Sequence, residues 1–196
     1  MSYERLLLIA KPFFSRDEVA HILGVQLDSA SVLLHRYMKK GLVTRLKRGL
    51  YARTEVLERL EFPDLFRISN ILQVPSYVSL YTALSFFGIT TQMQRNYVEA
   101  ISLKRTRYFR AGRFTFRFAR IRHSLYGGFL REEGMFIASP EKAFLDVCYL
   151  ASLGRYRPDI PSLDLGKLDR KKIDELADPY PSATSKYLRR IYDNAE

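Results

Sequence analysis

The chain has 196 residues, 47% of them hydrophobic and 27% charged, with 32 Lys and Arg against 21 Asp and Glu and a formal net charge of +11. This composition is typical of a globular protein and excludes a disordered or collagen-like chain. The single cysteine excludes a disulfide framework and a multi-cysteine zinc site, and it favours a reducing, cytoplasmic location. No apolar run has the length of a membrane span, and the first residues do not form a signal peptide.

The positive charge is concentrated in two stretches of the sequence. Residues 1–60 hold 11 basic and 6 acidic residues, and residues 96–131 hold nine basic residues and one acidic residue. Residues 61–95 are neutral, and residues 132–196 have a small negative balance. The surplus indicates a polyanionic partner, and its distribution argues against one diffuse basic surface.

The N-terminal stretch predicts two short helices joined by a tight turn. Ser15 and Glu18 have the spacing of a capping box, so a helix is expected to start there. Gly24 suits the position after the end of this helix, where a positive φ is needed. Two short helices around such a glycine are typical of a helix-turn-helix.

The second helix, for which Asp28 or Ser29 is the expected N-cap, extends to about Lys40 and has one apolar face. Its other face combines hydrogen-bonding, apolar and cationic side chains. Such a face can read base edges, and its cations can reach phosphates. The candidate DNA contacts from this part of the chain are Gln26, Ser29, Val32, His35, Arg36, Lys39 and Lys40.

A hairpin is predicted directly after this helix. Residues 42–46 and 50–52 are β-prone, and the turn between them is Lys47-Arg48-Gly49. This order of elements is that of a winged helix, whose basic wing meets phosphates or the minor groove beside the helix. We therefore predict DNA contacts from Arg45, Lys47 and Arg48. The alternative is a small packing unit or protein-interaction module with a solvated basic tip.

The expected fold class is α+β. A winged helix-turn-helix DNA-binding domain over residues 1–60 is followed, over residues 61–196, by a mixed helical and antiparallel-sheet domain. Further helices are expected over residues 54–73 with a break at Pro63, over 77–87, from Ser139 to about residue 151, and over 168–178 and 182–194.

In residues 97–122 the side-chain types alternate with a period of two, as Phe114, Phe116 and Phe118 do with the residues between them. This pattern predicts antiparallel strands with a turn at Ala111-Gly112. Their cations suggest a second anion-binding face for DNA, RNA or an acidic protein; the alternative is a solvated sheet face that cations protect from edge pairing. RNA binding would need exposed aromatic side chains, whereas the phenylalanine alternation indicates burial. This second basic face comprises Lys104, Arg105, Arg107, Arg110, Arg113, Arg117, Arg120 and Arg122.

No arrangement of catalytic groups emerges from the sequence. It has neither a glycine-rich phosphate loop nor a His-Glu-x-x-His motif, and its three histidines are scattered. Cys148 and Asp146 lie in an apolar helix, where we expect the cysteine to be a core residue and the aspartate to form a structural cap or an ion pair with an arginine. We expect no enzyme activity, no metal and no cofactor.

Three segments resemble a known family. They are RLKRGLY (Arg45–Tyr51), PSYVSLYTALSFFGI (Pro75–Ile89) and IASPEKAFLDVCYL (Ile137–Leu150), and they follow the predicted helix-turn-helix in that order. This pattern is similar to the AbiEi-type antitoxins, the transcriptional regulators of viral defence systems. The resemblance covers about residues 3–152.

The resemblance implies a bacterial or archaeal DNA-binding regulator with no catalytic residue. Its winged helix would bind an inverted repeat in its own promoter as paired copies and repress transcription. The C-terminal domain would oppose a co-encoded nucleotidyltransferase-like toxin, in a type IV system that does not require direct contact with that toxin. The antitoxin positions in the C-terminal domain are not assigned residue by residue, and residues 155–196 have no assigned role.

Overall fold

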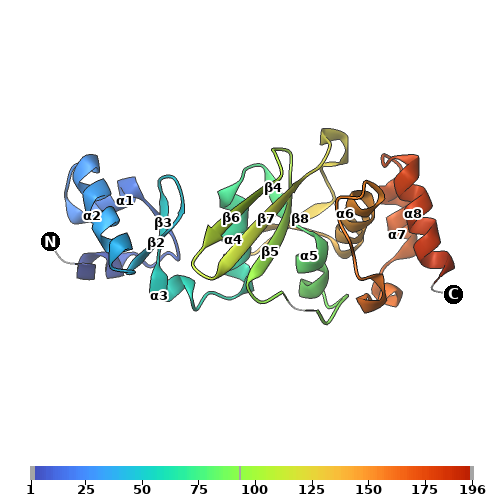
Figure 1. The fold of residues 1–196 in the computed structure, drawn as a ribbon, viewed down its shortest axis with the longest axis horizontal. Coiled ribbons are helices and arrows are strands. Elements are labelled where there is room, and N and C mark those ends of the chain that lie inside the picture. The colour runs from blue at the N-terminus through green and yellow to red at the C-terminus, as the bar shows by residue number, and fades with distance from the viewer. Residues whose placement is uncertain (1–2, 93, 195–196) are drawn as a thin grey trace.

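The computed structural model describes residues 3–92 and 94–194, and its N- and C-terminal ends lie at opposite ends of an elongated molecule (Figure 1). The N-terminal end is a winged helix, as predicted. Its elements are a 3-10 helix at Tyr3–Leu8, β1 (Phe14–Ser15), α1 (Arg16–Leu23), α2 (Leu27–Lys39), β2 (Val43–Lys47) and β3 (Leu50–Arg53).

Local sequence signals set the start and the end of α1. The Ser15 side chain accepts a hydrogen bond from the Glu18 amide, and the Glu18 carboxylate accepts one from the Ser15 amide, which confirms the capping box. Gly24 ends the helix with a φ of 65°. The prediction of the α2 cap was wrong: Gln26 is the N-cap and makes no side-chain cap bond, so Asp28 lies in the first turn.

The winged helix has its own small core. Leu6, Val19, Leu23 and Leu34 are buried between the 3-10 helix, α1 and α2. The two-residue strand β1 adds Phe14 to this core and pairs with Tyr51 of β3, giving a sheet in the order β1-β3-β2. Strand β1 could not be predicted from the sequence, because two residues are too few to show a period.

The remainder of the chain forms a larger mixed α/β unit. The sheet order is β6-β7-β5-β4-β9-β8, with helices packed around it (Figure 1). Its elements are α3 (Thr54–Leu57), α4 (Phe62–Leu72), β4 (Ser76–Val78), α5 (Leu80–Phe86), β5 (Tyr97–Ser102), β6 (Arg107–Ala111), β7 (Phe114–Arg120), β8 (Phe129–Glu132), β9 (Met135–Ala138), α6 (Pro140–Ser152), α7 (Arg170–Ala177), α8 (Ser182–Asp193) and short 3-10 helices at His123–Leu125, Ile160–Ser162 and Leu165–Lys167.

The α+β class is confirmed, but three expectations for this unit were wrong. The helix break expected at Pro63 lies at residues 58–61, and Pro63 is in the first turn of α4. The sheet is mixed, because β5 pairs with β7 and β4 with β9 in parallel, while the hairpin of β6 and β7 is antiparallel as predicted. In addition, residues 76–78 form strand β4 rather than the start of a helix, and α5 begins only at Leu80. An apolar run of this length satisfies a buried strand and a buried helix equally well.

Helix α6 lies at the centre of the larger unit. It packs against α5 on one side and against α7 and α8 on the other, so its side chains are buried on nearly every face. Ser139 caps it, as predicted, by accepting a hydrogen bond from the Lys142 amide. Strand β7 contributes Phe114, Phe116 and Phe118, all buried.

The two units share a junction rather than a free linker. Leu46 and Ala52, from the wing strands, are buried in the core of the larger unit, and β2 lies beside β6. Lys47 Nζ donates a hydrogen bond to the Ile71 carbonyl oxygen at 2.6 Å, and a guanidinium N–H of Arg113 donates to the Glu58 carbonyl oxygen at 2.7 Å. These contacts fix one side of the wing against the C-terminal unit. Within the described ranges, no helix has the length and apolar character needed to cross a membrane.

Candidate nucleic-acid interface

Helix α2 presents one face to the small core and the opposite face to solvent. Ala30, Leu34 and Tyr37 are buried on the inner face. The predicted DNA-contact positions on the outer side are all exposed, and even the apolar Val32 has 53% of its surface accessible. The exposed set is Gln26, Ser29, Val32, His35, Arg36, Lys39 and Lys40.

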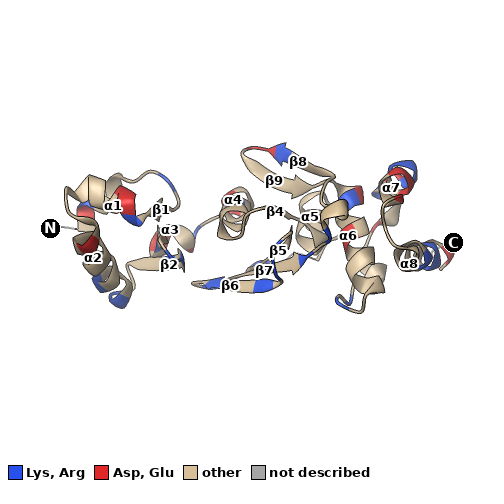
Figure 2. Ribbon diagram, turned by 90° about the horizontal axis from the view of Figure 1, so that it is seen from above, with Lys and Arg blue, Asp and Glu red and all other residues tan. Residues whose placement is uncertain are grey.

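The cations of α2 gather toward its C-terminal end. Arg36 and Lys39 lie in the last turn and Lys40 is the C-cap residue, where positive charge is favourable. Across residues 3–92 and 94–194, none of these three side chains forms an ion pair. Figure 2 shows Lys and Arg positions at this end of α2 and along β6 and β7. A helix with exposed hydrogen-bonding and cationic side chains can contact base edges while its cations bind the phosphates of the DNA backbone.

The wing presents fewer free cations than the sequence predicts. Arg48 is exposed at the hairpin turn, and Arg45 is exposed with its Nε–H donating to the Lys47 carbonyl oxygen at 3.4 Å. Lys47 points to the larger unit through its bond to Ile71, and burial together with nearby Lys104 lowers the pKa of its ammonium group. The structure argues against Lys47 as a DNA contact, because its ammonium group is directed to the Ile71 carbonyl oxygen inside the protein.

The second basic face predicted from residues 97–122 is not one surface. Arg117 pairs with Glu99 at 2.9 Å, and the side chains are only 13% and 2% exposed. The Tyr156 hydroxyl donates to the same carboxylate at 2.8 Å. Burial raises the pKa of Glu99, and these two partners oppose that effect. Arg117 is thus an internal structural residue and not part of an open face.

The other cations of this segment divide between two places. Arg107 lies over the ring of Phe109, Arg113 bonds to Glu58, and Arg110 is exposed, all along the β6–β7 hairpin near the wing. Beyond the strand ends, Lys104 is exposed near Lys47, and a separate cavity is lined by Arg105, Arg120, Arg122 and Arg155. The last of these arginines was absent from the predicted set, because it follows α6 in the sequence.

The stacking surface that RNA binding would need is small. Phe114, Phe116 and Phe118 are buried, in agreement with the predicted alternation. Tyr108, at 56% exposure, lies between Arg107 and Arg110 on the edge strand β6. A single exposed ring offers one stacking position, whereas RNA-binding sheets present several.

Asp146 has the structural role that the sequence predicts, although its partner is a lysine rather than an arginine. Its carboxylate pairs with Lys142 one turn earlier in α6 and accepts hydrogen bonds from Tyr77 and Ser79 at 3.0 and 2.8 Å. The Tyr180 hydroxyl lies between the ammonium and the carboxylate, and burial raises its pKa. All these groups are buried, so they stabilise the core and are closed to a ligand.

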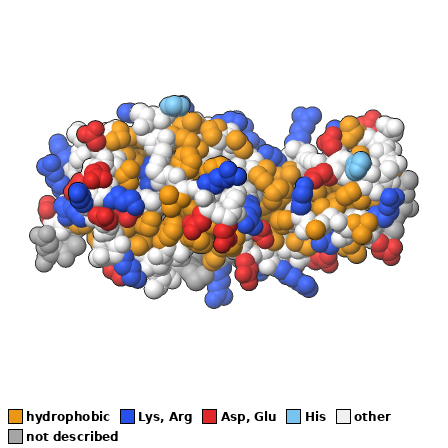
Figure 3. Space-filling model, turned by 180° about the vertical axis from the view of Figure 1, so that it is seen from behind, with side chains coloured by type: hydrophobic (Ala, Val, Ile, Leu, Met, Phe, Trp, Pro, Cys, Tyr) orange, Lys and Arg blue, Asp and Glu red, His pale blue; other side chains and the backbone are white. Residues whose placement is uncertain are grey.

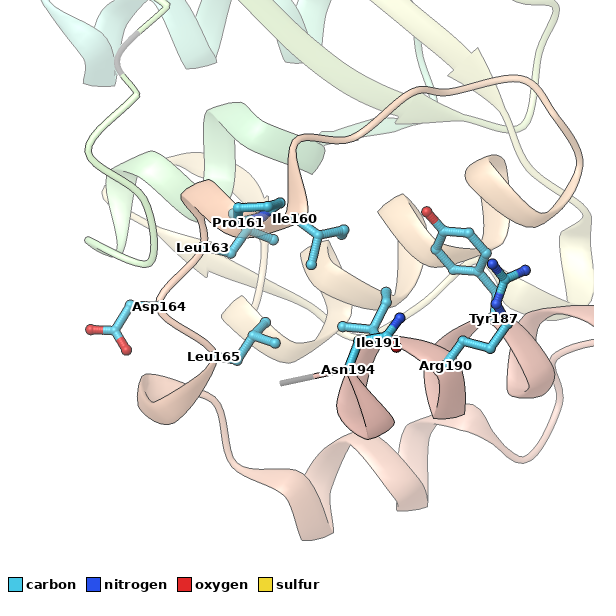
Figure 4. Close-up of a pocket in the computed structure, with 9 residues that line it drawn as sticks. All are labelled: Ile160, Pro161, Leu163, Asp164, Leu165, Tyr187, Arg190, Ile191 and Asn194. Carbon is cyan, nitrogen blue, oxygen red and sulfur yellow. The ribbon is translucent and has the colours of Figure 1, made fainter. Parts of the chain in front are cut away.

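Two further features of the larger unit are possible sites. Cys148 is buried in α6, and burial raises the pKa of its thiol, so it is unsuited to act as a nucleophile. A hollow of about 590 Å³ lies between residues 160–165 and α8. Figure 4 shows the apolar side chains of Ile160, Leu165 and Ile191 around this hollow and Asp164 pointing away from it. Among the described residues, no group of three or more His, Cys, Asp or Glu side chains is placed to hold a metal ion.

The face opposite to that of Figure 1 has no surface of a single charge. Figure 3 shows Lys and Arg side chains interspersed with Asp and Glu, and hydrophobic side chains scattered between them. Such a mixed surface does not attract a polyanion as a whole. The cationic positions on α2 and the β6–β7 hairpin are therefore the candidates for an extended nucleic-acid contact.

The comparisons with known proteins agree with the architecture. Over its whole length the chain is similar in fold to the crystal structure of the RV2827C protein from Mycobacterium tuberculosis, with a TM-score of 0.67, 12% identity, and coverage of 97% of this chain and 74% of the other. No curated protein matches the sequence. Residues 1–54 match the model of the family described as "Transcriptional regulator, AbiEi antitoxin". The match confirms that the N-terminal winged helix of this chain is similar to that of the AbiEi antitoxin transcriptional regulators; of the three motifs that carry the predicted resemblance, Arg45–Tyr51 lies within the matched residues.

Proposed function

We propose that this protein binds duplex DNA through the outer face of α2 and represses transcription from its own promoter. The observation that carries the proposal is that α2 has a buried apolar face and an opposite, exposed polar face. Its apolar side chains are used by the small core, while hydrogen-bonding and cationic side chains remain exposed and unpaired among the described residues. The family match over residues 1–54 supports this function.

In the proposed complex α2 enters the major groove. Arg36 is the base-reading residue, since a guanidinium can form two hydrogen bonds to guanine. Lys39, Lys40 and Arg48 contact phosphates beside the groove and contribute affinity without sequence preference. Paired copies of the chain cover an inverted repeat, and each α2 occupies one half-site.

We also propose that the chain acts as the antitoxin of a type IV system and opposes a nucleotidyltransferase-like toxin. The support is again the family of the N-terminal region, whose description combines regulation with antitoxin activity. No residue of the C-terminal unit is assigned to this role, and the proposal includes no catalytic step and no cofactor. Co-expression with the product of an adjacent gene tests it. Growth rescued by the intact chain supports the proposal, and no rescue by the intact chain opposes it.

The DNA-binding proposal is tested by fluorescence anisotropy on the region upstream of the chain's own gene. A triple variant, Ser29→Ala, Arg36→Ala and Lys39→Ala, should bind about a thousandfold more weakly, since each of the three contacts contributes about tenfold. The matched control removes one exposed serine and two exposed cations of α8, by Ser182→Ala, Lys186→Ala and Arg189→Ala. These lie at the opposite end of the molecule from α2 (Figure 1). Equal affinity of the two triple variants would disprove the assignment of α2.

A further inference from the structure

We propose that the arginine-lined cavity between the sheet and the end of α6 binds a nucleoside polyphosphate. The cavity has a volume of about 500 Å³, within the range of pockets that hold small molecules. Four guanidinium-bearing residues line it: Arg105 from the loop after β5, Arg120 at the end of β7, Arg122 shortly after it, and Arg155 after α6. This inference does not depend on DNA binding by α2.

The four arginines have no acidic partner within the part of the chain that the structure describes. None forms an ion pair, and none donates a side-chain hydrogen bond there. Some other arginines of the same unit are paired, as Arg117 is with Glu99 and Arg67 with Asp64, and others, such as Arg110 and Arg131, form no ion pair among the described residues. The four differ from these because they line one cavity together. A hollow surrounded by charges of one sign concentrates their field and attracts an anion. The missing counter-charge is therefore expected from a ligand.

The arginines are also not needed to satisfy the carbonyl groups at the C-terminal end of α6. Cationic side chains often satisfy the last carbonyl groups of a helix. In α6 these carbonyls already accept backbone hydrogen bonds, from Gly154 to Ala151 at 2.9 Å and from Arg155 to Leu150 at 2.8 Å. The Arg155 guanidinium is thus free to serve the cavity.

The backbone around the cavity is held in place. The Arg120 amide donates to Thr106 Oγ1 at 3.2 Å, and the Gln73 side-chain amide donates to the Arg105 carbonyl oxygen at 3.0 Å. The Ile121 amide donates to the Ser102 carbonyl oxygen at 3.0 Å. Because these bonds order the backbone before any ligand arrives, a ligand loses less free energy to ordering.

The lining favours a nucleotide over inorganic phosphate or a DNA backbone. Tyr149 and Leu153 are part of the lining, and Leu153 is 40% exposed beside the guanidinium groups. Because Tyr149 is only 2% exposed, it is Leu153 against which a base or ribose can pack, while the arginines bind phosphates in bidentate hydrogen bonds. A duplex backbone is convex and extended, and it contacts an open surface more readily than a cavity of this size.

Isothermal titration calorimetry on the full chain tests the proposal with ATP, GTP, tripolyphosphate and adenosine. We expect one of the nucleotides to bind at micromolar concentration, tripolyphosphate to bind more weakly, and adenosine not to bind. The double variant Arg120→Ala and Arg122→Ala should lose about a hundredfold in nucleotide affinity, since a charge-assisted bond contributes about tenfold. The matched control, Arg107→Ala and Arg110→Ala, removes the same charge from β6 outside the cavity and should bind as the wild type does.

A second measurement guards against a folding defect. Nucleotide should raise the melting temperature of the wild type and of the control variant, and should leave that of the cavity variant unchanged. The proposal is overturned if neither nucleotide binds at millimolar concentration, if adenosine binds as well as ATP, or if both double variants lose affinity equally. It is also overturned if the double variant Arg120→Ala and Arg122→Ala binds duplex DNA more weakly than the wild type but binds nucleotides with unchanged affinity.

Discussion

The two basic regions of this protein both have a surplus of positive charge, but the fold places their cations in different surroundings. In the N-terminal region the cations of α2 stay exposed on one side of a helix whose other side is buried. In the region 97–122, Arg117 forms an internal ion pair, and Arg107 and Arg113 contact neighbouring groups of the protein. Three further arginines of this region line a cavity together with Arg155. The comparison teaches that a count of charges predicts a polyanionic partner but not the surface on which it binds.

The largest expected effect is on stability, and it distinguishes an internal, ion-paired arginine from an exposed one. Arg117→Ala should lower the free energy of unfolding by about 3 kcal/mol, because it leaves the buried carboxylate of Glu99 without its partner. Arg120→Ala, on the same strand but exposed, should change it by less than about 0.5 kcal/mol. Urea denaturation measures both. Similar losses in the two variants would mean that the basic segment is a uniform surface after all.

The second prediction concerns the reading of sequence by α2. Arg36→Ala should weaken binding to the operator by about tenfold and reduce its preference over unrelated DNA, as loss of a base contact does. Lys40→Ala should weaken all sequences alike and reduce the dependence of affinity on salt by about one unit of slope. Anisotropy titrations at two salt concentrations distinguish these outcomes. If Arg36→Ala weakens both kinds of DNA equally, Arg36 contacts phosphate only.

A smaller effect is expected at the wing. Arg48→Ala should reduce the salt slope of DNA binding, whereas Lys47→Met should leave the slope unchanged. Instead, Lys47→Met should cost about 1 kcal/mol of stability, because it removes the hydrogen bond to the Ile71 carbonyl oxygen. Parallel measurements of unfolding and of DNA affinity test this division. A reduced slope for Lys47→Met with unchanged stability would restore Lys47 to the DNA-binding set.

Structural features that depend on residues close together in the sequence could be predicted, whereas features that depend on residues far apart in the sequence could not. Neighbouring residues determine the capping box of Ser15 and Glu18 and the turn at Gly24, and both were predicted. The exposed face of α2 follows from helical periodicity. The pairing of Arg117 with Glu99, the contact of Lys47 with Ile71 and the position of Arg155 require the tertiary fold, because these partners belong to different elements. The candidate site was therefore predictable in α2 and only partly so in the wing and the sheet.

The smallest predicted effect is the pH dependence contributed by α1. Hydrogen bonds from the Ser15 amide and from Lys11 lower the pKa of Glu18 below 4.5. A lowered pKa in the folded state stabilises the protein above the unfolded pKa, and this contribution is lost as the pH falls through the folded value. Because the side chain is 40% exposed, the effect should be about 0.5 kcal/mol or less. Glu18→Gln should flatten the stability curve between about pH 5 and pH 3, as measured by urea denaturation, and an unchanged curve would contradict it.

Photo-crosslinking tests most directly whether α2, rather than the β6–β7 hairpin, is the DNA-binding surface. A benzoylphenylalanine placed at Val32, which is 53% exposed at the middle of the α2 outer face, should crosslink to operator DNA. The same group at Leu130 on β8, 47% exposed, serves as the control and should not. Crosslinking from position 32 alone is the result predicted here. Crosslinking from Tyr108 on β6, with none from position 32, would contradict the account.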